Sequence, residues 1–198
     1  MDRSWSLAPE AIELLERLVG EVQPRHILEF GSGTSTAALA AACASLPHSV
    51  VITSIDHDPH FARVAAEGLG QVAGPVTVKF VLAPLVLRVV GGKLLPVYLP
   101  EPIGEAAKSP ADLVLVDGPP AALGGREGTL HQALERSREG TVIVVDDAAR
   151  ASEREAIANW RAAVGDAIEI REPDGFSRGV AVAMVRAPHP ARVVRRAG

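Results

Sequence analysis

Residues 26–44, HILEFGSGTSTAALAAACA, decide the fold. The first five residues are mostly apolar and short enough for a buried strand, and the alanine-rich segment 37–44 favours a helix. Gly31 and Gly33 lie between them, so the stretch predicts a strand, a glycine-rich turn and a helix. Ligands of open parallel sheets bind at the carboxyl ends of the strands. This turn is therefore the first candidate for a ligand site.

The same alternation of strand and helix continues along the chain. It predicts a Rossmann-like α/β fold, in which a mostly parallel sheet carries helices on both faces. The last two strands flank Pro173-Asp174-Gly175 and predict an antiparallel C-terminal hairpin. Gly91, Gly92 and several prolines argue against a long regular element over 91–109 and predict a loop or an excursion. The expected strands are 26–30, 49–55, 76–82, 111–116, 141–145, 167–171 and 180–185, and the expected helices are 9–19, 37–44, 58–67, 127–138 and 152–164.

Length and composition predict one globular domain over residues 1–198. Hydrophobic residues make up 47% of the chain and aromatic residues only 4%, which suits a core of aliphatic strands covered by helices. The formal net charge of −4 argues against a nucleic-acid partner, whose phosphates require a basic surface. Residues 1–24 are expected to form a helical segment in which Trp5 could close over the site. The basic tail 187–198 is expected to be frayed.

Cysteine content and hydropathy indicate the compartment. Cys43 is the only cysteine, so disulfides contribute nothing and a reducing environment fits best. No segment approaches the ~20 apolar residues of a membrane span. We expect a cytoplasmic protein without a membrane partner, as a monomer or a homodimer.

A second candidate ligand residue follows the strand predicted at 49–55. Asp56 stands at its carboxyl end, where a carboxylate can accept hydrogen bonds from both hydroxyls of a ribose. Together with the glycine turn, it indicates an adenosine-type ligand, although an isolated acid here could instead cap the next helix or lie in a turn. Thr36 stands where a dinucleotide fingerprint needs its third glycine, which argues against NAD.

Three acids follow two further strands. Asp117 ends the strand 111–116, and Asp146 and Asp147 end the strand 141–145. Neighbouring parallel strands lie about 4.8 Å apart, so these carboxylates can share one hard divalent cation. Without a cation they would repel one another and raise one another's pKa. The alternative is that Asp146 and Asp147 cap the next helix and Asp117 lies in a turn.

The segments ILEFGSGTSTAALA (27–40), SIDHDPHFA (54–62) and DLVLVDGPP (112–120) resemble successive motifs of class I S-adenosylmethionine (SAM)-dependent methyltransferases, over roughly residues 10–186. The resemblance implies that the glycine turn contacts the methionine part of SAM, that Asp56 holds the ribose, and that His57 and Ala83 lie near the adenine. The cofactor-binding residues implied in this way are Glu29, Gly31, Ser32, Gly33, Ser35, Asp56, His57, Ala83 and Asp117.

The acid cluster resembles that of the cation-dependent O-methyltransferases of the catechol type, which hold magnesium with one Asp and a later Asp-Asn pair. Asp147 replaces that Asn, and Pro120 stands where those enzymes have a lysine general base. The resemblance implies metal ligation by Asp117, Asp146 and Asp147, with Asp117 and Asp147 catalytic and Asp147 or solvent accepting the acceptor's proton.

A closer local similarity is to glucuronoxylan-type methyltransferases. It rests on Asp117-Gly118-Pro119-Pro120, on Gly125-Arg126-Glu127-Gly128, and on Asp147 followed by Arg150 and Glu153. In those relatives the position of Asp146 is commonly His. Arg126 could pair with an anionic group of the substrate or be a solvated loop residue.

These observations predict a SAM-dependent methyltransferase that methylates a hydroxyl of a small molecule with Mg²⁺ or Mn²⁺. Two alternatives remain open. One is a metal-independent N- or C-methyltransferase with the same cofactor site, and the other is a catalytically silent SAM-binding scaffold.

Overall fold

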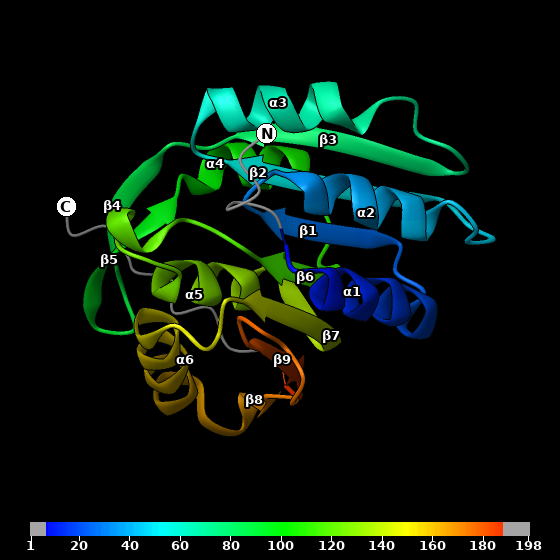
Figure 1. The fold of residues 1–198 in the computed structure, drawn as a ribbon. Helices are drawn as coiled ribbons and strands as arrows, with labels where there is room; N and C mark the ends of the chain where they lie inside the picture. The colour runs from blue at the N-terminus through cyan, green and yellow to red at the C-terminus, as the bar shows by residue number, and fades with distance from the viewer. Residues whose placement is uncertain (1–6, 188–198) are drawn as a thin grey trace.

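The computed structural model describes residues 7–187, which form a seven-stranded sheet between two layers of helices (Figure 1). The strand order is β3-β2-β1-β6-β7-β9-β8, in which the first five strands run parallel and β9 and β8 are antiparallel to their neighbours. The Rossmann-like prediction is therefore confirmed. The strands are β1 His26–Phe30, β2 Val50–Asp56, β3 Val76–Leu82, β6 Ala111–Val116, β7 Ser137–Asp146, β8 Ile168–Arg171 and β9 Val180–Val185.

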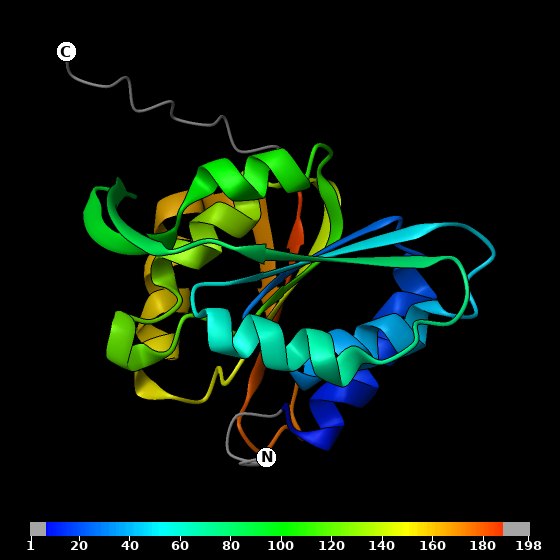
Figure 2. The same ribbon diagram turned by 90° about the horizontal axis from the view of Figure 1, so that it is seen from above.

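The first three helices of the chain lie on one face of the sheet, and the last three lie on the other (Figures 1 and 2). Alternate residues of β1 show why, since Ile27 packs with α1 and α2, whereas Leu28 and Phe30 pack with α4, α5 and α6. Successive side chains of a strand point to opposite faces, so one apolar strand supplies both cores. The helices are α1 Pro9–Val22, α2 Thr34–Cys43, α3 Pro59–Leu69, α4 Pro100–Ala106, α5 Glu127–Glu135 and α6 Ala151–Val164.

Residues 91–109 belong to an excursion from the main sheet, one of the two expected alternatives, and not to an irregular loop. Strands β4 (Leu85–Val90) and β5 (Lys93–Tyr98) form an antiparallel hairpin beyond the main sheet, and α4 follows it. The hairpin turns at Gly91 and Gly92, which both have positive φ (58° and 82°), as two-residue hairpin turns require. Proline does not prevent either element, because Pro100 occupies the first turn of α4, where no backbone N–H is needed.

The remaining differences lie at element boundaries. The helix expected to begin at Ala37 begins at Thr34, so Ser35 and Thr36 are helical. The expected N-terminal helix is present as α1, whereas Trp5 and nearly all of the basic tail lie outside the described residues. Within 7–187, no helix is both long and apolar enough to cross a membrane.

Candidate active site

The sequence-predicted residues meet at one edge of the sheet, where β2, β1, β6 and β7 end side by side. The turn Gly31–Gly33 follows β1, Asp56 ends β2, Asp117 follows β6, and Asp146 ends β7. Parallel strands end at the same edge, so Gly31 and Asp146, which are 115 positions apart in the chain, lie at one site. This edge is therefore the candidate active site.

The fully buried carboxylate of Glu29 stabilises the glycine turn through side-chain hydroxyls that contact it. The hydroxyls of Ser35, Thr36 and Ser54 each donate a hydrogen bond of 2.6 Å to it. Burial raises the pKa of Glu29. Thr36 Oγ1 also accepts from the N–H of Gly33 at 3.3 Å, so the residue that breaks the dinucleotide fingerprint is a structural part of this turn. A direct contact of Glu29 with the cofactor stays a prediction.

Asp56 ties the same turn to β2. Its Oδ2 accepts from the backbone N–H of Ser32 at 2.9 Å and its Oδ1 from that of Asp58 at 2.8 Å. Burial raises the pKa of Asp56. His57 Nδ1 lies 3.4 Å from Asp56 Oδ1, and the buried Ala83 donates its N–H to the Asp56 carbonyl at 2.8 Å. The residues expected around the nucleoside thus lie together.

The helix-cap alternatives for these acids are wrong. Asp58, not Asp56, is the N-cap of α3, where its side chain accepts from His60 N–H at 2.8 Å. The N-cap position of α6 is Arg150, so neither Asp146 nor Asp147 caps that helix. Asp147 instead has a left-handed backbone (φ 57°), which is uncommon for a residue other than glycine.

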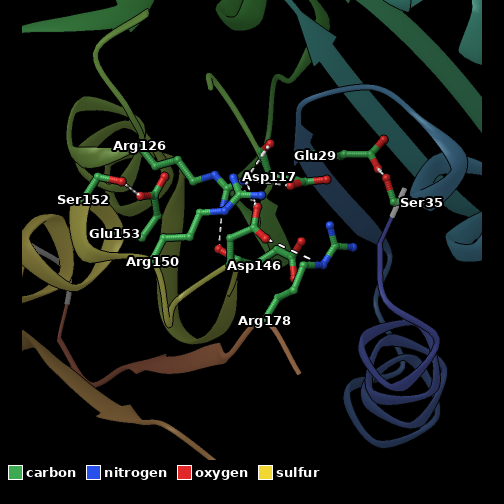
Figure 3. Close-up of polar contacts among 10 residues, drawn as sticks. Glu29, Ser35, Asp117, Arg126, Asp146, Arg150, Ser152, Glu153 and Arg178 are labelled. Carbon is green, nitrogen blue, oxygen red and sulfur yellow. Dashed lines mark hydrogen bonds and ion pairs between the residues drawn. The ribbon is translucent and has the colours of Figure 1, made fainter. Parts of the chain in front are cut away.

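Arg126 lies in the middle of the acid cluster (Figure 3). Its Nη2 donates to Asp117 Oδ1 at 2.8 Å and to Asp147 Oδ2 at 2.9 Å, and its Nη1 donates to the Asp146 carbonyl. Only 3% of Arg126 is exposed. The cation that the clustered carboxylates require is thus supplied at least in part by this guanidinium. The expectation of a solvated loop residue at position 126 is wrong, because the side chain is buried.

Two further arginines reach the cluster from its rim. Arg150 Nη1 lies 2.9 Å from Asp147 Oδ2, and Arg178 Nε lies 3.7 Å from Asp147 Oδ1. Glu153 of α6 is buried beside Ser152, whose hydroxyl donates to it (Figure 3). Asp147 is therefore the aspartate that the arginines neutralise most.

Asp117 and Asp146 are less fully compensated. Burial, opposed by Arg126 and reinforced by Asp146, Asp147 and Glu29, raises the pKa of Asp117 to about 8. Burial and the neighbouring Asp147 also raise the pKa of Asp146. Among the described residues, Asp146 Oδ1 and Asp147 Oδ1 are buried and have no hydrogen-bond partner. Carboxylate oxygens of the three aspartates lie within 4.8 Å of one another, as ligands of a single cation would.

The two glycines of the turn differ in what surrounds them. Gly31 has φ +98°, and a Cβ there would lie 3.0 Å from the Asp117 carbonyl carbon. It is needed for close approach of two backbones. Gly33 is extended (φ −174°), and a Cβ there would meet only Ser35 Oγ, at 4.0 Å. Gly33 therefore borders the space in which a ligand can approach the turn.

We expect the two glycines to fail differently when substituted. Gly31→Ala should lower the free energy of unfolding by at least about 1–2 kcal/mol, the cost of a left-handed backbone with a Cβ. Gly33→Val should fold normally but lose S-adenosylhomocysteine (SAH) binding. Thermal melts and calorimetry with SAH measure both effects. Normal SAH binding by Gly33→Val would place the ligand elsewhere.

The sheet order, with a glycine turn and an acid at the ends of adjacent strands, defines a class I methyltransferase fold. A family model described as "Methyltransferase domain" matches residues 28–148, more than half of the chain. The chain therefore belongs to this methyltransferase family. The matched segment contains every site residue predicted from the sequence, from Glu29 to Asp147.

Solved structures agree on the fold. The O-methyltransferase of Bacillus cereus in complex with SAH has a TM-score of 0.67 at 18% identity, over 92% of this chain and 84% of that one. The SAH-bound methyltransferase PaMTH1 of Podospora anserina has a TM-score of 0.65 at 16% identity, over 93% and 82%. The O-methyltransferase TomG of Streptomyces achromogenes in complex with SAM has a TM-score of 0.64 at 20% identity, over 92% and 82%. A search of curated proteins found no match.

Proposed function

We propose that this protein is a SAM-dependent O-methyltransferase that methylates a small-molecule hydroxyl at a site holding Mg²⁺ or Mn²⁺. The observation that carries the proposal is that the glycine turn, Asp56 and three clustered aspartates share one edge of a methyltransferase fold. The first two suit a nucleoside-bearing methyl donor, and the third suits an oxygen acceptor. Methyl transfer requires the donor's methyl group and the acceptor oxygen to be aligned, so the two sites must adjoin.

The donor half is held by the turn after β1 and the end of β2. Glu29 and Asp56 fix the turn from two sides, so the backbone around Gly33 is preorganised for a ligand. The donor is an activated sulfonium, so the protein has to supply alignment and exclusion of water rather than activation of the methyl group. Ser32, Ser35, His57 and Ala83 complete the proposed cofactor set.

The acceptor half is the cluster of Asp117, Asp146 and Asp147. The donor set fits a hard cation, because Asp146 Oδ1 and Asp147 Oδ1 are buried oxygens that accept no hydrogen bond within residues 7–187. A bound divalent cation lowers the pKa of a hydroxyl that it contacts. Pro120 excludes a lysine base at that position, so Asp147 or solvent is the proposed proton acceptor, with Arg126 holding Asp117 and Asp147 in place.

Arg126 also supports a second candidate, a metal-independent O-, N- or C-methyltransferase. Its guanidinium already bridges Asp117 and Asp147, so the cluster holds one permanent cation. A SAM-binding scaffold without turnover is the third candidate, and methyl transfer to any acceptor would remove it. We further propose a small-molecule acceptor rather than nucleic acid, a cytoplasmic location, and a monomer or homodimer.

The donor assignment is tested with Asp56→Ala. Loss of a hydrogen bond to a charged group should weaken SAH binding by about 1.5–3 kcal/mol, roughly 10- to 150-fold in Kd. Asp58→Ala is the matched control, because it removes the cap of α3 two residues away and keeps the backbone N–H that Asp56 accepts. Calorimetry with SAH decides the outcome. Unchanged affinity in a folded Asp56→Ala variant would remove the ribose role, and tight NAD binding by the wild type would overturn the donor.

A further inference from the structure

Tyr98, the last residue of β5, enters the site from a hairpin that the sequence did not predict. Its side chain is fully buried, with its ring centroid 5.5 Å from that of Phe30 and 6.2 Å from that of His57. Gln132 of α5 fixes the backbone on both sides, since its Oε1 accepts from Tyr98 N–H at 2.8 Å and its Nε2 donates to the Tyr98 carbonyl at 2.7 Å. The position of the ring is therefore set by two elements outside the main sheet.

The Tyr98 hydroxyl lies where the turns after β1 and β6 meet. A Cβ built on Gly118 would lie 2.5 Å from this hydroxyl oxygen and 3.3 Å from the Cα of Gly31. The hydroxyl therefore occupies space that any side chain at position 118 would take. Asp56 and Asp117 lie near enough to raise the pKa of Tyr98, which burial already raises well above its usual range. The group stays a hydrogen-bond donor over the working range of pH.

This donor has nothing to donate to within residues 7–187, where the hydroxyl is fully buried and makes no hydrogen bond. A buried polar group without a partner costs free energy, and phenylalanine would fill the same volume without that cost. Buried polar atoms are otherwise almost always paired. A hydroxyl in this position, among residues proposed to hold a ligand, indicates that its partner is the ligand.

We propose that the Tyr98 hydroxyl donates a hydrogen bond to the bound methyl donor and so acts as a positioning residue at the junction of Gly31 and Gly118. The inference rests on the proposed SAM site and extends it to the hairpin β4–β5. The hairpin thereby has a function beyond packing, because it carries a donor to the cofactor at the point where the glycine turn and the acid cluster adjoin.

The test compares Tyr98→Phe with Thr129→Val. Thr129 of α5 carries another buried hydroxyl without a partner among the described residues, and it belongs to no proposed contact. Both changes remove one hydroxyl from a buried site and should leave the melting temperature of the unliganded protein unchanged or higher. Tyr98→Phe should raise the Kd for SAH roughly 5- to 50-fold, and Thr129→Val should leave it unchanged.

The wild-type protein offers a second measurement, because Tyr98 is the only tyrosine of the chain. Tyrosine labelled with ¹³C at the ζ-carbon gives one signal, which SAH should shift in the wild type. An unshifted signal together with equal affinities in wild type and Tyr98→Phe would overturn the role of Tyr98 and leave the donor site intact. Absence of SAH binding by the wild type would overturn the proposed function and this inference with it.

Discussion

Replacing Arg126 by methionine is expected to lower the free energy of unfolding by about 3–5 kcal/mol, the range for removing one partner from a buried ion pair. Methionine keeps much of the volume but leaves Asp117 and Asp147 without the guanidinium that now bonds both. The Asp146 carbonyl also loses a donor. Urea unfolding at pH 7 measures the loss.

Arg63→Met is the matched control for Arg126→Met. Arg63 pairs with Glu67 at 2.9 Å, but both side chains are more than half exposed, at 60% and 63%. Exposed pairs contribute only about 0–1 kcal/mol. A similarly small loss for Arg126→Met would mean that the buried aspartates do not depend on the guanidinium, and it would leave their compensation to Arg150 and Arg178.

The deficit of Arg126→Met should shrink as the pH falls. Without the guanidinium the folded-state pKa of Asp117 rises further above the value of an unfolded aspartate, so the folded variant takes up a proton before the unfolded chain does. Stability relative to the wild type is therefore recovered on the acidic side. Urea curves at pH 7 and at pH 9, on either side of the folded-state pKa of Asp117, check this sign, and the deficit should be larger at pH 9.

The position of the acid cluster could be predicted from the sequence because it depends only on where apolar runs end. The runs before Asp56, Asp117 and Asp146 are buried parallel strands, and neighbouring parallel strands finish at one edge. The end of a buried strand can be predicted from the hydrophobic pattern without knowing the conformation of the loop that follows. The glycine turn was predictable for the same reason.

The arrangement of the cations around that cluster could not be predicted, because it depends on loops. Arg126 precedes α5, Arg150 precedes α6 and Arg178 lies between β8 and β9, so their meeting at Asp147 follows from three separate loop conformations. Neither hydrophobic periodicity nor spacing carries that information. The sequence interpretation of Arg126 as a substrate partner treated a buried structural cation as an exposed one.

The hairpin β4–β5 was missed for a different physical reason. Glycine and proline usually interrupt helices and strands, although Gly91-Gly92 is the composition that a tight hairpin turn favours. A two-stranded sheet beside the main one also lacks the regular spacing that marks the parallel strands. Tyr98 was overlooked with it, and the signal that could have found it was a lone tyrosine ending an apolar run.

The structure changes which aspartate best tests the metal. Asp147 interacts with Arg126, Arg150 and Arg178, so Asp147→Asn would remove ion pairs as well as a metal ligand. Asp146 Oδ1 instead has no hydrogen-bond partner among the described residues, and its raised pKa shows that burial disfavours the charged form. A carboxyl whose folded pKa is raised lowers stability at neutral pH, so its removal from the unliganded protein is not costly.

Asp146→Asn is therefore expected to keep or raise the melting temperature in chelator while abolishing stabilisation by Mn²⁺. For the wild type, a cation present at 100 times its Kd adds about 2.7 kcal/mol to the free energy of unfolding, and the variant should show almost none of this gain. Asp147→Asn should lose stability both with and without the cation, because it removes one of the two carboxylates that pair with the buried Arg126. Paired melts in Mn²⁺ and in chelator, together with calorimetric titration of Mn²⁺ alone, separate the two variants without any acceptor. If the wild type gains no stability from Mn²⁺ or Mg²⁺ and binds neither, arginine side chains and not a metal neutralise the cluster, and the metal-independent methyltransferase replaces the metal-dependent one.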